Sequence, residues 1–133
     1  MNGLLSFDYD SLQGQRVVSI MGCAARQTKE GMKVNQVALI LERATLLISV
    51  HEDTDEIILR ASEDGRAIMG SSRKWRKLTP LSKYTAKKVG WCWTARNDRG
   101  YGDLFILSFR GIEPEVVFCG IASSLWIYKV KRI

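Results

Sequence analysis

The feature that most constrains this chain is a succession of short segments, each the length of a β-strand and closed by turn residues. Within them, apolar side chains alternate with polar ones or form brief apolar runs. The segments cover residues 16–22, 35–42, 45–52, 55–62, 89–96, 101–109, 115–120 and 124–130. A period of two places successive side chains on opposite faces of a strand. We therefore predict a mostly β fold, α+β at the margin, in which about eight strands form an antiparallel meander.

Several of these segments are apolar at every position, which means that both faces of the strand are apolar. The clearest cases are residues 37–41, 104–107 and 125–128. A single sheet with one face in water leaves half of these side chains exposed. Two packed sheets, a strongly coiled sheet that closes on itself, or a dimer that covers the second face would each bury them. We expect a sandwich or a strongly coiled sheet.

The remaining sequence predicts one or two short helices and one long irregular segment. Residues 8–14 form a candidate helix that ends at Gly14, and Thr79-Pro80 is typical of a second helix start. Asp64-Gly65 favours a hairpin turn into a strand at 66–69. Residues 70–88 show no clean period, so we interpret them as a basic loop inserted into a single domain that spans residues 1–133.

Cysteine usage and apolar run lengths indicate the compartment. Cys23, Cys92 and Cys119 are odd in number, far apart and embedded in apolar sequence, which is typical of buried thiols in the cytoplasm. The longest uninterrupted apolar run, residues 37–41, is too short to cross a membrane. The first ten residues lack a basic region followed by an apolar one, so no secretory signal is expected.

The charge of the chain is strongly polarised. Residues 1–65 carry 6 basic and 10 acidic side chains, whereas residues 66–133 carry 14 basic and 4 acidic ones. The segment 70–90 has seven basic residues, no acidic one, and two interleaved rings, Trp75 and Tyr84. Cations neutralise phosphates and exposed rings stack on bases, so this segment is a candidate nucleic-acid surface. Its residues are Arg73, Lys74, Trp75, Arg76, Lys77, Lys83, Lys87 and Lys88.

Three other interpretations of the basic segment stay open. It is also compatible with a solvated loop that protects a sheet edge from aggregation. It is equally compatible with a segment that pairs with the acidic turn 52–56 of the same molecule, or with a surface for a protein or a lipid. No helix-turn-helix, zinc finger or aromatic RNA-binding motif accompanies it.

A second candidate site is the hairpin GWCWTARNDRGYGD, residues 90–103. Trp91 and Trp93 share one face of a strand, and Asn97 and Gly100 suit a short loop. Burial preferences favour an aromatic face packed into the core. The functional alternative makes the tryptophans the floor of a groove with polar groups at its rim. The candidate residues are Trp91, Trp93, Asn97, Tyr101 and Asp103.

The pattern W-x-W-x-x-x-N-x-x-G-Y-x-D in this hairpin resembles the signature of a family of small uncharacterised bacterial proteins. The segments LFILSF (104–109), CGIASSLWIYKV (119–130) and HEDTDEI (51–57) fit the same resemblance. It is most specific over residues 89–130 and extends to 10–62 in general layout. The resemblance implies a compact β-rich bacterial domain and no known activity. Small proteins of this style are often partners of larger ones, such as immunity factors of toxin systems.

Catalytic and metal-binding patterns are missing from the sequence. The one histidine, His51, stands beside acidic residues, but no G-x-S-x-G elbow accompanies it. The cysteines lack C-x-x-C spacing, and the acidic turn 52–56 lacks the glycine and distal glutamate of a calcium loop. We therefore predict no catalytic residue, no metal and no cofactor. An enzyme that works through Asp103 and the acidic turn is the weakest hypothesis.

Taken together, these features favour a non-catalytic protein-interaction module, immunity-like or adaptor-like, that acts on a protein partner or as a homo-oligomer. The motivating observations are the strands that are apolar on both faces, the polarised charge and the missing catalytic groups. Nucleic-acid binding through residues 73–88 is the alternative.

Overall fold

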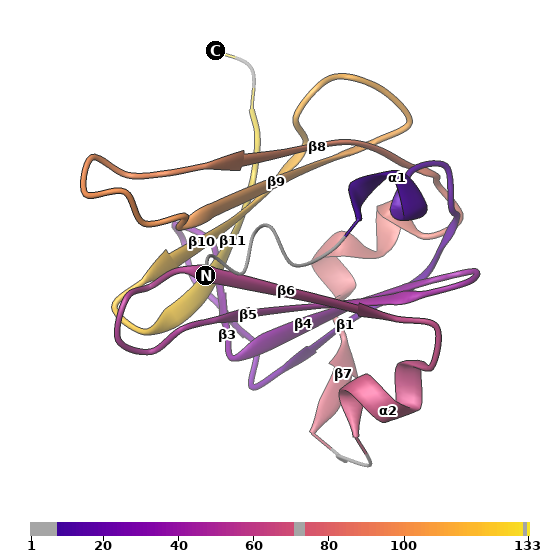
Figure 1. Cartoon of the computed structure of the whole chain (residues 1–133), viewed down its shortest axis with the longest axis horizontal. Helices are drawn as coiled ribbons and strands as arrows, with labels where there is room; N and C mark the ends of the chain where they lie inside the picture. The colour runs from indigo at the N-terminus through magenta and orange to yellow at the C-terminus, as the bar shows by residue number, and fades with distance from the viewer. Residues whose placement is uncertain (1–7, 71–73, 132) are drawn as a thin grey trace.

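The computed structural model describes residues 8–70, 74–131 and 133, and shows two antiparallel β-sheets packed face to face (Figure 1). The five-stranded sheet has the strand order β6-β5-β4-β1-β7, and the six-stranded sheet has the order β2-β3-β11-β10-β9-β8. The strands of the first are β1 (Val17–Cys23), β4 (Gln36–Leu41), β5 (Thr45–Val50), β6 (Ile57–Ser62) and β7 (Trp75–Lys77). Those of the second are β2 (Arg26–Gln27), β3 (Met32–Val34), β8 (Val89–Ala95), β9 (Leu104–Phe109), β10 (Val116–Ile121) and β11 (Ser124–Lys129). The predicted mostly β sandwich is confirmed.

One bent hairpin contributes strands to both sheets. Its first arm runs from β1 into β2 and its second from β3 into β4, with Cys23 opposite Gln36 and Arg26 opposite Lys33. The first arm bends at Ala24, which has a φ of 53°. The predicted strand at 35–42 corresponds to β4, whereas the short strand β3, which lies before the bend and belongs to the other sheet, was not predicted.

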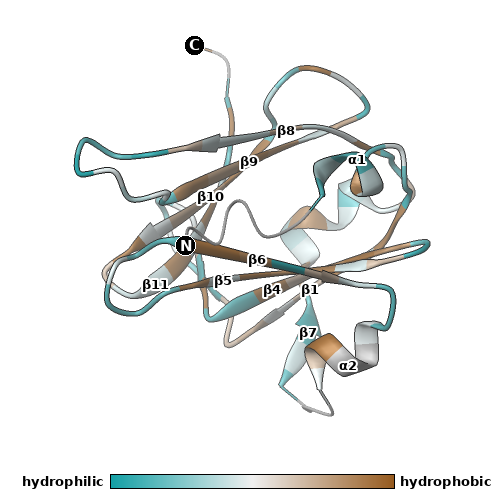
Figure 2. Ribbon diagram, viewed as in Figure 1, coloured by the Kyte–Doolittle hydropathy of each residue, from teal (hydrophilic) through white to brown (hydrophobic). Residues whose placement is uncertain are grey.

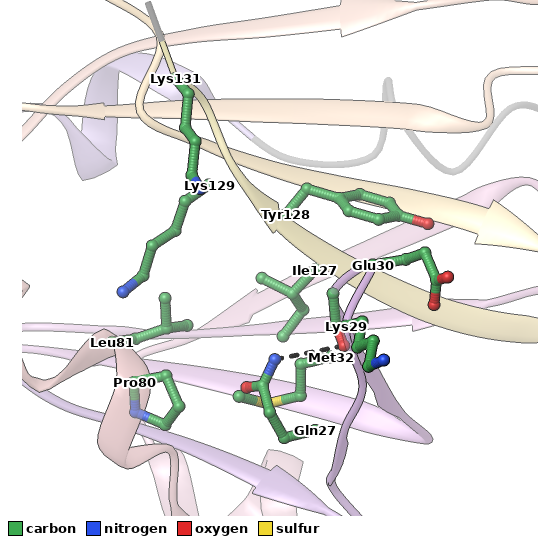
Figure 3. Close-up of a pocket in the computed structure, with 11 residues that line it drawn as sticks. Gln27, Lys29, Glu30, Met32, Pro80, Leu81, Ile127, Tyr128, Lys129 and Lys131 are labelled. Atoms are coloured by element: carbon green, nitrogen blue, oxygen red, sulfur yellow. Dashed lines mark hydrogen bonds between the residues drawn. The ribbon is translucent and has the colours of Figure 1, made fainter.

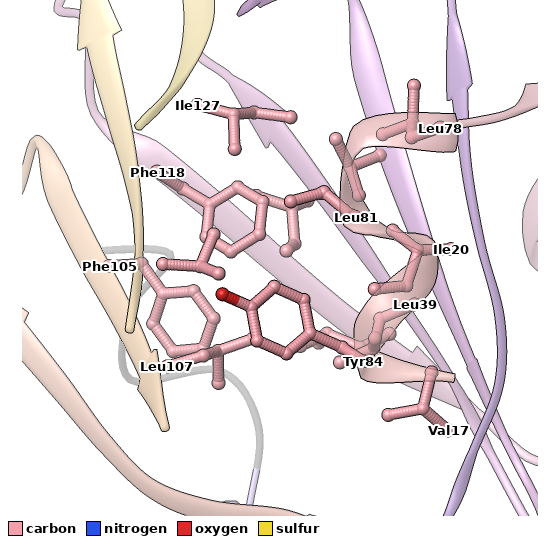
Figure 4. Packing of buried hydrophobic residues seen from close by; sticks show 14 of the residues in the cluster. Val17, Ile20, Leu39, Leu78, Leu81, Tyr84, Phe105, Leu107, Phe118 and Ile127 are labelled. Carbon is pink, nitrogen blue, oxygen red and sulfur yellow. The ribbon is translucent and has the colours of Figure 1, made fainter. Parts of the chain in front are cut away.

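The core lies between the two sheets and draws side chains from both (Figure 4). Figure 2 shows the hydrophobic colouring concentrated along the strands and the hydrophilic colouring in the loops. Helix α1 (Tyr9–Leu12) adds Leu12 to the core and is capped by Asp8, whose carboxylate accepts from the Asp10 N–H at 3.0 Å. Gly14 follows with a φ of +83°, which a glycine adopts without strain, so the predicted helix end is confirmed.

The prediction of a strand at 66–69 is wrong, because these residues belong to helix α2 (Gly65–Met69). A strand there would have extended the five-stranded sheet beyond its edge strand β6. Instead the chain turns over the outer face of that sheet and packs Ile68 and Met69 against Ala38, Leu47 and Trp75. The turn into the helix is tight, because a Cβ on Gly65 would lie 2.6 Å from Oγ1 of Thr45.

The prediction of an irregular basic loop at residues 70–88, with a short helix at Thr79-Pro80, misses one strand. Residues 75–77 form β7, which pairs with β1, and the 3₁₀ helix η2 (Thr79–Tyr84) follows. The predicted short helix at Thr79-Pro80 is thus present. Leu78, Leu81 and Tyr84 point into the core (Figure 4). The Tyr84 ring stacks on Phe109 with centroids 4.4 Å apart.

Candidate functional site

The outer face of the six-stranded sheet carries two rows of apolar side chains that cross its strands. Strand pairing places the members of each row directly opposite one another. The first row consists of Trp93, Ile106, Val117 and Tyr128. The second consists of Ala95, Leu104, Cys119 and Trp126, and it ends in Lys33 and Arg26. We call these two rows, together with Trp91, the open face.

The open face is accessible to solvent. Its eight uncharged row members are half-buried, and Trp91 is 54% exposed. Trp126 and Tyr128 stack with ring centroids 6.2 Å apart, and Trp91 and Trp93 lie at the same separation in a tilted arrangement. In the described part of the chain no helix covers this face, because α1 and η2 contribute to the central core and α2 packs on the other sheet. Such a contiguous aromatic patch is typical of a binding surface.

The interpretation of Trp91 and Trp93 as core residues is wrong, and a bulge in β8 explains why. The pairing between β8 and β9 slips between Val89 and Cys92, so that Cys92 stands opposite Leu107. Val89 faces the core, but the bulge turns both tryptophans to the outer face. Gly90 permits the bulge, because a Cβ there would lie 2.5 Å from the Gly111 carbonyl oxygen.

The polar residues of this hairpin shape its loop. The Asn97 side-chain carbonyl accepts from the N–H groups of Arg99 at 2.9 Å and Tyr101 at 3.2 Å. The Asn97 amide donates to the Asp103 carboxylate at 3.3 Å. Gly100 adopts a φ of +87°, as the sequence predicts for a glycine in this loop. Asn97 and Asp103 therefore hold the loop at the end of the sheet, next to the half-exposed Tyr101.

The acidic turn after β5 ties the two sheets together. The two carboxylate oxygens of Asp55 accept from the N–H groups of Ser123 at 2.7 Å and Ala122 at 3.1 Å. The Ser123 hydroxyl donates to the Glu52 carbonyl at 2.6 Å. Ala122 and Ser123, the two loop residues between β10 and β11, both have a positive φ, which non-glycine residues adopt at a cost. The Asp55 carboxylate stabilises that conformation.

The basic segment does not assemble the predicted combination of cations and exposed rings. Trp75 is 8% exposed and Tyr84 2% exposed, so both rings are part of the packed interior. The exposed cations are Lys74, Arg76, Lys77, Lys83 and Lys88; Lys87 is half-buried, and Arg73 lies outside the described residues. The ammonium groups of Lys83 and Lys87 lie 5.1 and 5.6 Å from the centroid of the Tyr84 ring. The segment is thus a structural element with a charged outer side.

Two cysteine thiols favour their neutral form, and the His51 ring accepts a hydrogen bond within its own turn. Burial raises the pKa of Cys92 to about 12. Burial also raises the pKa of Cys119, and the carboxylates of Asp103 and Asp55 raise it further. His51 is exposed, and its Nδ1 accepts from the Asp53 N–H at 3.2 Å, which places the ring in its own turn. Among the described residues, no three His, Cys, Asp or Glu side chains gather closely enough to hold a metal ion.

Most of the open face was not predicted from the sequence. Trp91 and Trp93 were predicted as candidate site residues, whereas the remaining apolar members were not: Ala95, Leu104, Ile106, Val117, Cys119, Trp126 and Tyr128. The sequence does indicate this surface, because the runs 104–107 and 125–128 are apolar on both faces of their strands and only one face can point into the core. The structure shows that no described element of the chain covers the other face.

The fold and the open face define a class of protein, a two-sheet β-sandwich with one aromatic sheet face open to solvent. The chain belongs to a family of unknown function (DUF6334), whose model matches residues 1–133. Comparison with curated proteins and with solved structures finds no match. Across the residues that the structure describes, no helix has the length and apolar character needed to cross a bilayer.

Proposed function

We propose that this chain is a non-catalytic protein-interaction module, immunity-like or adaptor-like, that binds a partner protein through the open face. The observation that carries the proposal is the continuous aromatic and aliphatic surface across β8 to β11, which no described element covers. The three free cysteines support a reducing location, and we retain the cytoplasm as part of the proposal.

The composition of the open face favours a protein over other partners. The centres of protein interfaces are depleted of charge and enriched in tryptophan, tyrosine and arginine, with polar groups at the rim. The two central rows carry no charged side chain across β8 to β11, and the cations Arg26 and Lys33 lie only at the β2–β3 edge. The partner that fits is a protein with an apolar contact surface and carboxylates that meet this cationic edge.

Nucleic acid is the alternative partner, and the charge pattern is less favourable to it. A single strand needs cations that follow its backbone beside the stacking rings. The rings of the open face have cations in their rows at one edge only, and the rings of the basic segment are buried. The experiment must therefore also measure whether a single-stranded oligonucleotide binds and whether that binding weakens with salt.

The test compares two matched valine-to-lysine variants. Val117→Lys puts a charge in the middle of the open face, between Ile106 and Tyr128. Val18→Lys makes the same change at an exposed valine of β1 in the other sheet. Wild type and both variants serve as bait in extracts of the cells that express the chain, and the recovered proteins are identified. Direct binding of each chain to the purified partner is then measured.

We expect wild type and Val18→Lys to bind the same partner with equal affinity, and Val117→Lys to bind at least tenfold more weakly, because its ammonium group is desolvated in the complex. Trp126→Ala should weaken binding without a charge change. Equal binding by Val117→Lys, or recovery of nucleic acid in place of a protein, would contradict the proposal. A second copy of the chain as partner would show self-association, measured by sedimentation equilibrium.

A further inference from the structure

A cavity of about 450 Å³ lies beside the hairpin of β2 and β3, and Tyr128 borders both this cavity and the open face (Figure 3). Three elements form it: the hairpin of β2 and β3, the helix η2, and the last residues of β11. Its volume is within the ordinary range of small-molecule sites. All of the residues that line it are among the described ones.

The floor of the cavity is apolar. Met32, Leu81 and Ile127 line it with the few atoms that these core residues leave exposed, and the exposed Pro80 of η2 and the half-buried Tyr128 add apolar walls. Figure 3 shows Leu81 and Pro80 on one side of Ile127, with Met32 below it. This floor suits a compact apolar group, because such a group removes apolar surface from water when it binds.

The rim of the cavity is cationic. Lys29, Lys129 and Lys131 line it, and Glu30 is the only acidic side chain among its lining residues. Among the described residues, none of these three ammonium groups forms an ion pair or a hydrogen bond. In Figure 3 the Lys129 side chain extends from β11 toward Pro80 and Leu81, across the opening. Unpaired cations around a low-dielectric floor concentrate anions.

The hairpin wall of the cavity is held in place before any ligand binds. The Gln27 side-chain amide donates to the backbone carbonyls of Thr28 at 3.0 Å and Gly31 at 3.3 Å. Gly31 packs so closely on Tyr128 that a Cβ would lie 2.7 Å from the tyrosine ring. A preformed wall lowers the ordering cost of binding.

We propose that this cavity binds a small organic anion with an apolar body. The apolar part would lie on Met32, Leu81 and Ile127, and the carboxylate, sulfonate or phosphate group would lie between Lys129 and Lys131. The cavity and the open face share Tyr128, but the proposed anion contacts use Lys129 and Lys131, which are not part of the open face, so either proposal can fail without the other.

The probe is 8-anilinonaphthalene-1-sulfonate, compared with N-phenyl-1-naphthylamine, which has the same aromatic body without the sulfonate. Fluorescence titration of wild type should give tighter binding of the sulfonate. The Lys129→Gln/Lys131→Gln double variant should bind the sulfonate about three- to tenfold more weakly and the neutral dye unchanged, because two exposed cations contribute modestly each. The matched control Lys77→Gln/Lys88→Gln removes two exposed cations outside the cavity and should behave as wild type.

Binding is located by NMR, with the methyl signals of Leu81 and Ile127 for the cavity and the indole N–H signals of Trp93 and Trp126 for the open face. Shifts at the methyl signals are expected. Three results would overturn the proposal: shifts at the indole signals alone, equal affinity for the two dyes, or a sulfonate affinity that both double variants lower equally. Circular dichroism establishes that each variant is folded.

Discussion

The outer faces of both sheets are apolar, but among the described elements only the outer face of the five-stranded sheet is covered. Strands β4 and β5 present Ala38 and Leu47 outward, and both are fully buried because α2 and Trp75 lie over them. The Trp75 indole N–H donates to the Met69 carbonyl at 3.1 Å, which fixes ring and helix together. Strands β9 to β11 present equally apolar outward side chains, but in the described structure nothing lies over them.

This difference separates an apolar face that the chain covers with its own segments from one that it leaves open to another molecule. Burial of a second face is worth the hydrophobic free energy of its area, and a chain can obtain it from its own segments or from another molecule. On the five-stranded sheet, a short helix and one tryptophan provide that cover. On the six-stranded sheet no described element provides such a cover, which is why we propose that this face binds a partner.

The largest effect is expected from removing the cover of the five-stranded sheet. Trp75→Ala should lower the free energy of unfolding by about 3–5 kcal/mol, because it leaves a cavity and an unpartnered Met69 carbonyl. Urea unfolding measures this. The same substitution on the open face, Trp126→Ala, is the control; equal losses from the two variants would break the comparison.

The next largest loss of stability is expected at Asp55, whose carboxylate connects the two sheets. Asp55→Ala removes the acceptor of the Ala122 and Ser123 N–H groups and should cost about 1.5–2 kcal/mol, since these bonds join amides to a carboxylate.

The substitution Ala122→Asn places a residue that accepts positive φ at the first position of this two-residue turn and keeps the Ser123 hydroxyl bond to the Glu52 carbonyl. Introduced into the Asp55→Ala chain, it should restore part of the loss. No recovery would show that Asp55 acts through something other than the turn conformation.

Truncation on the open face should cost less. Trp126→Ala removes one half-buried ring and its stacking on Tyr128, which corresponds to about 1 kcal/mol or less. The same variant should bind the partner protein markedly more weakly. A loss of stability as large as that of Trp75→Ala would mean that the ring is part of the folded core.

The last prediction is a pH dependence of stability, which has no effect at neutral pH and appears only above pH 9. Burial raises the pKa of Cys92 to about 12 from 9.0, so the folded state favours the neutral thiol. That contribution is fully present below pH 9 and is lost as the pH rises toward 12, because the unfolded chain releases the proton first. The free energy of unfolding should fall over this window by the slope of one proton, and the difference from Cys92→Ala isolates it. A rise in stability with pH would contradict the assignment.

The strands and turns that depend on neighbouring residues could be predicted from the sequence. All eight predicted strand segments contain a strand, and the Asn97 loop and the Gly14 helix end follow from turn chemistry. Strands β2 and β7 are two and three residues long, too short to show a period. The bulge at Gly90 was hidden, because parity assumes an unbroken ladder.

The candidate site was predicted only in part, for a physical reason. The two-sided apolar runs indicate that a cover is needed, but a sequence pattern does not say whether the chain supplies it. Trp75 stands between two basic residues and Trp91 between a glycine and a cysteine, yet Trp75 is buried and Trp91 is exposed. The Asp55 tie joins residues 67 and 68 positions apart, which no local pattern reveals.

Two cysteines in the same molecule test the central claim most directly. Cys119 lies within the open face, whereas Cys23 packs at the outer cluster of the five-stranded sheet, and both thiols are half-buried. Labelling by an uncharged maleimide is followed at each cysteine, in buffer and in a concentrated extract of the expressing cells. We expect the extract to slow the labelling of Cys119 severalfold and to leave Cys23 unchanged. An unchanged ratio between the two rates would contradict the assignment of the open face as the protein-binding surface.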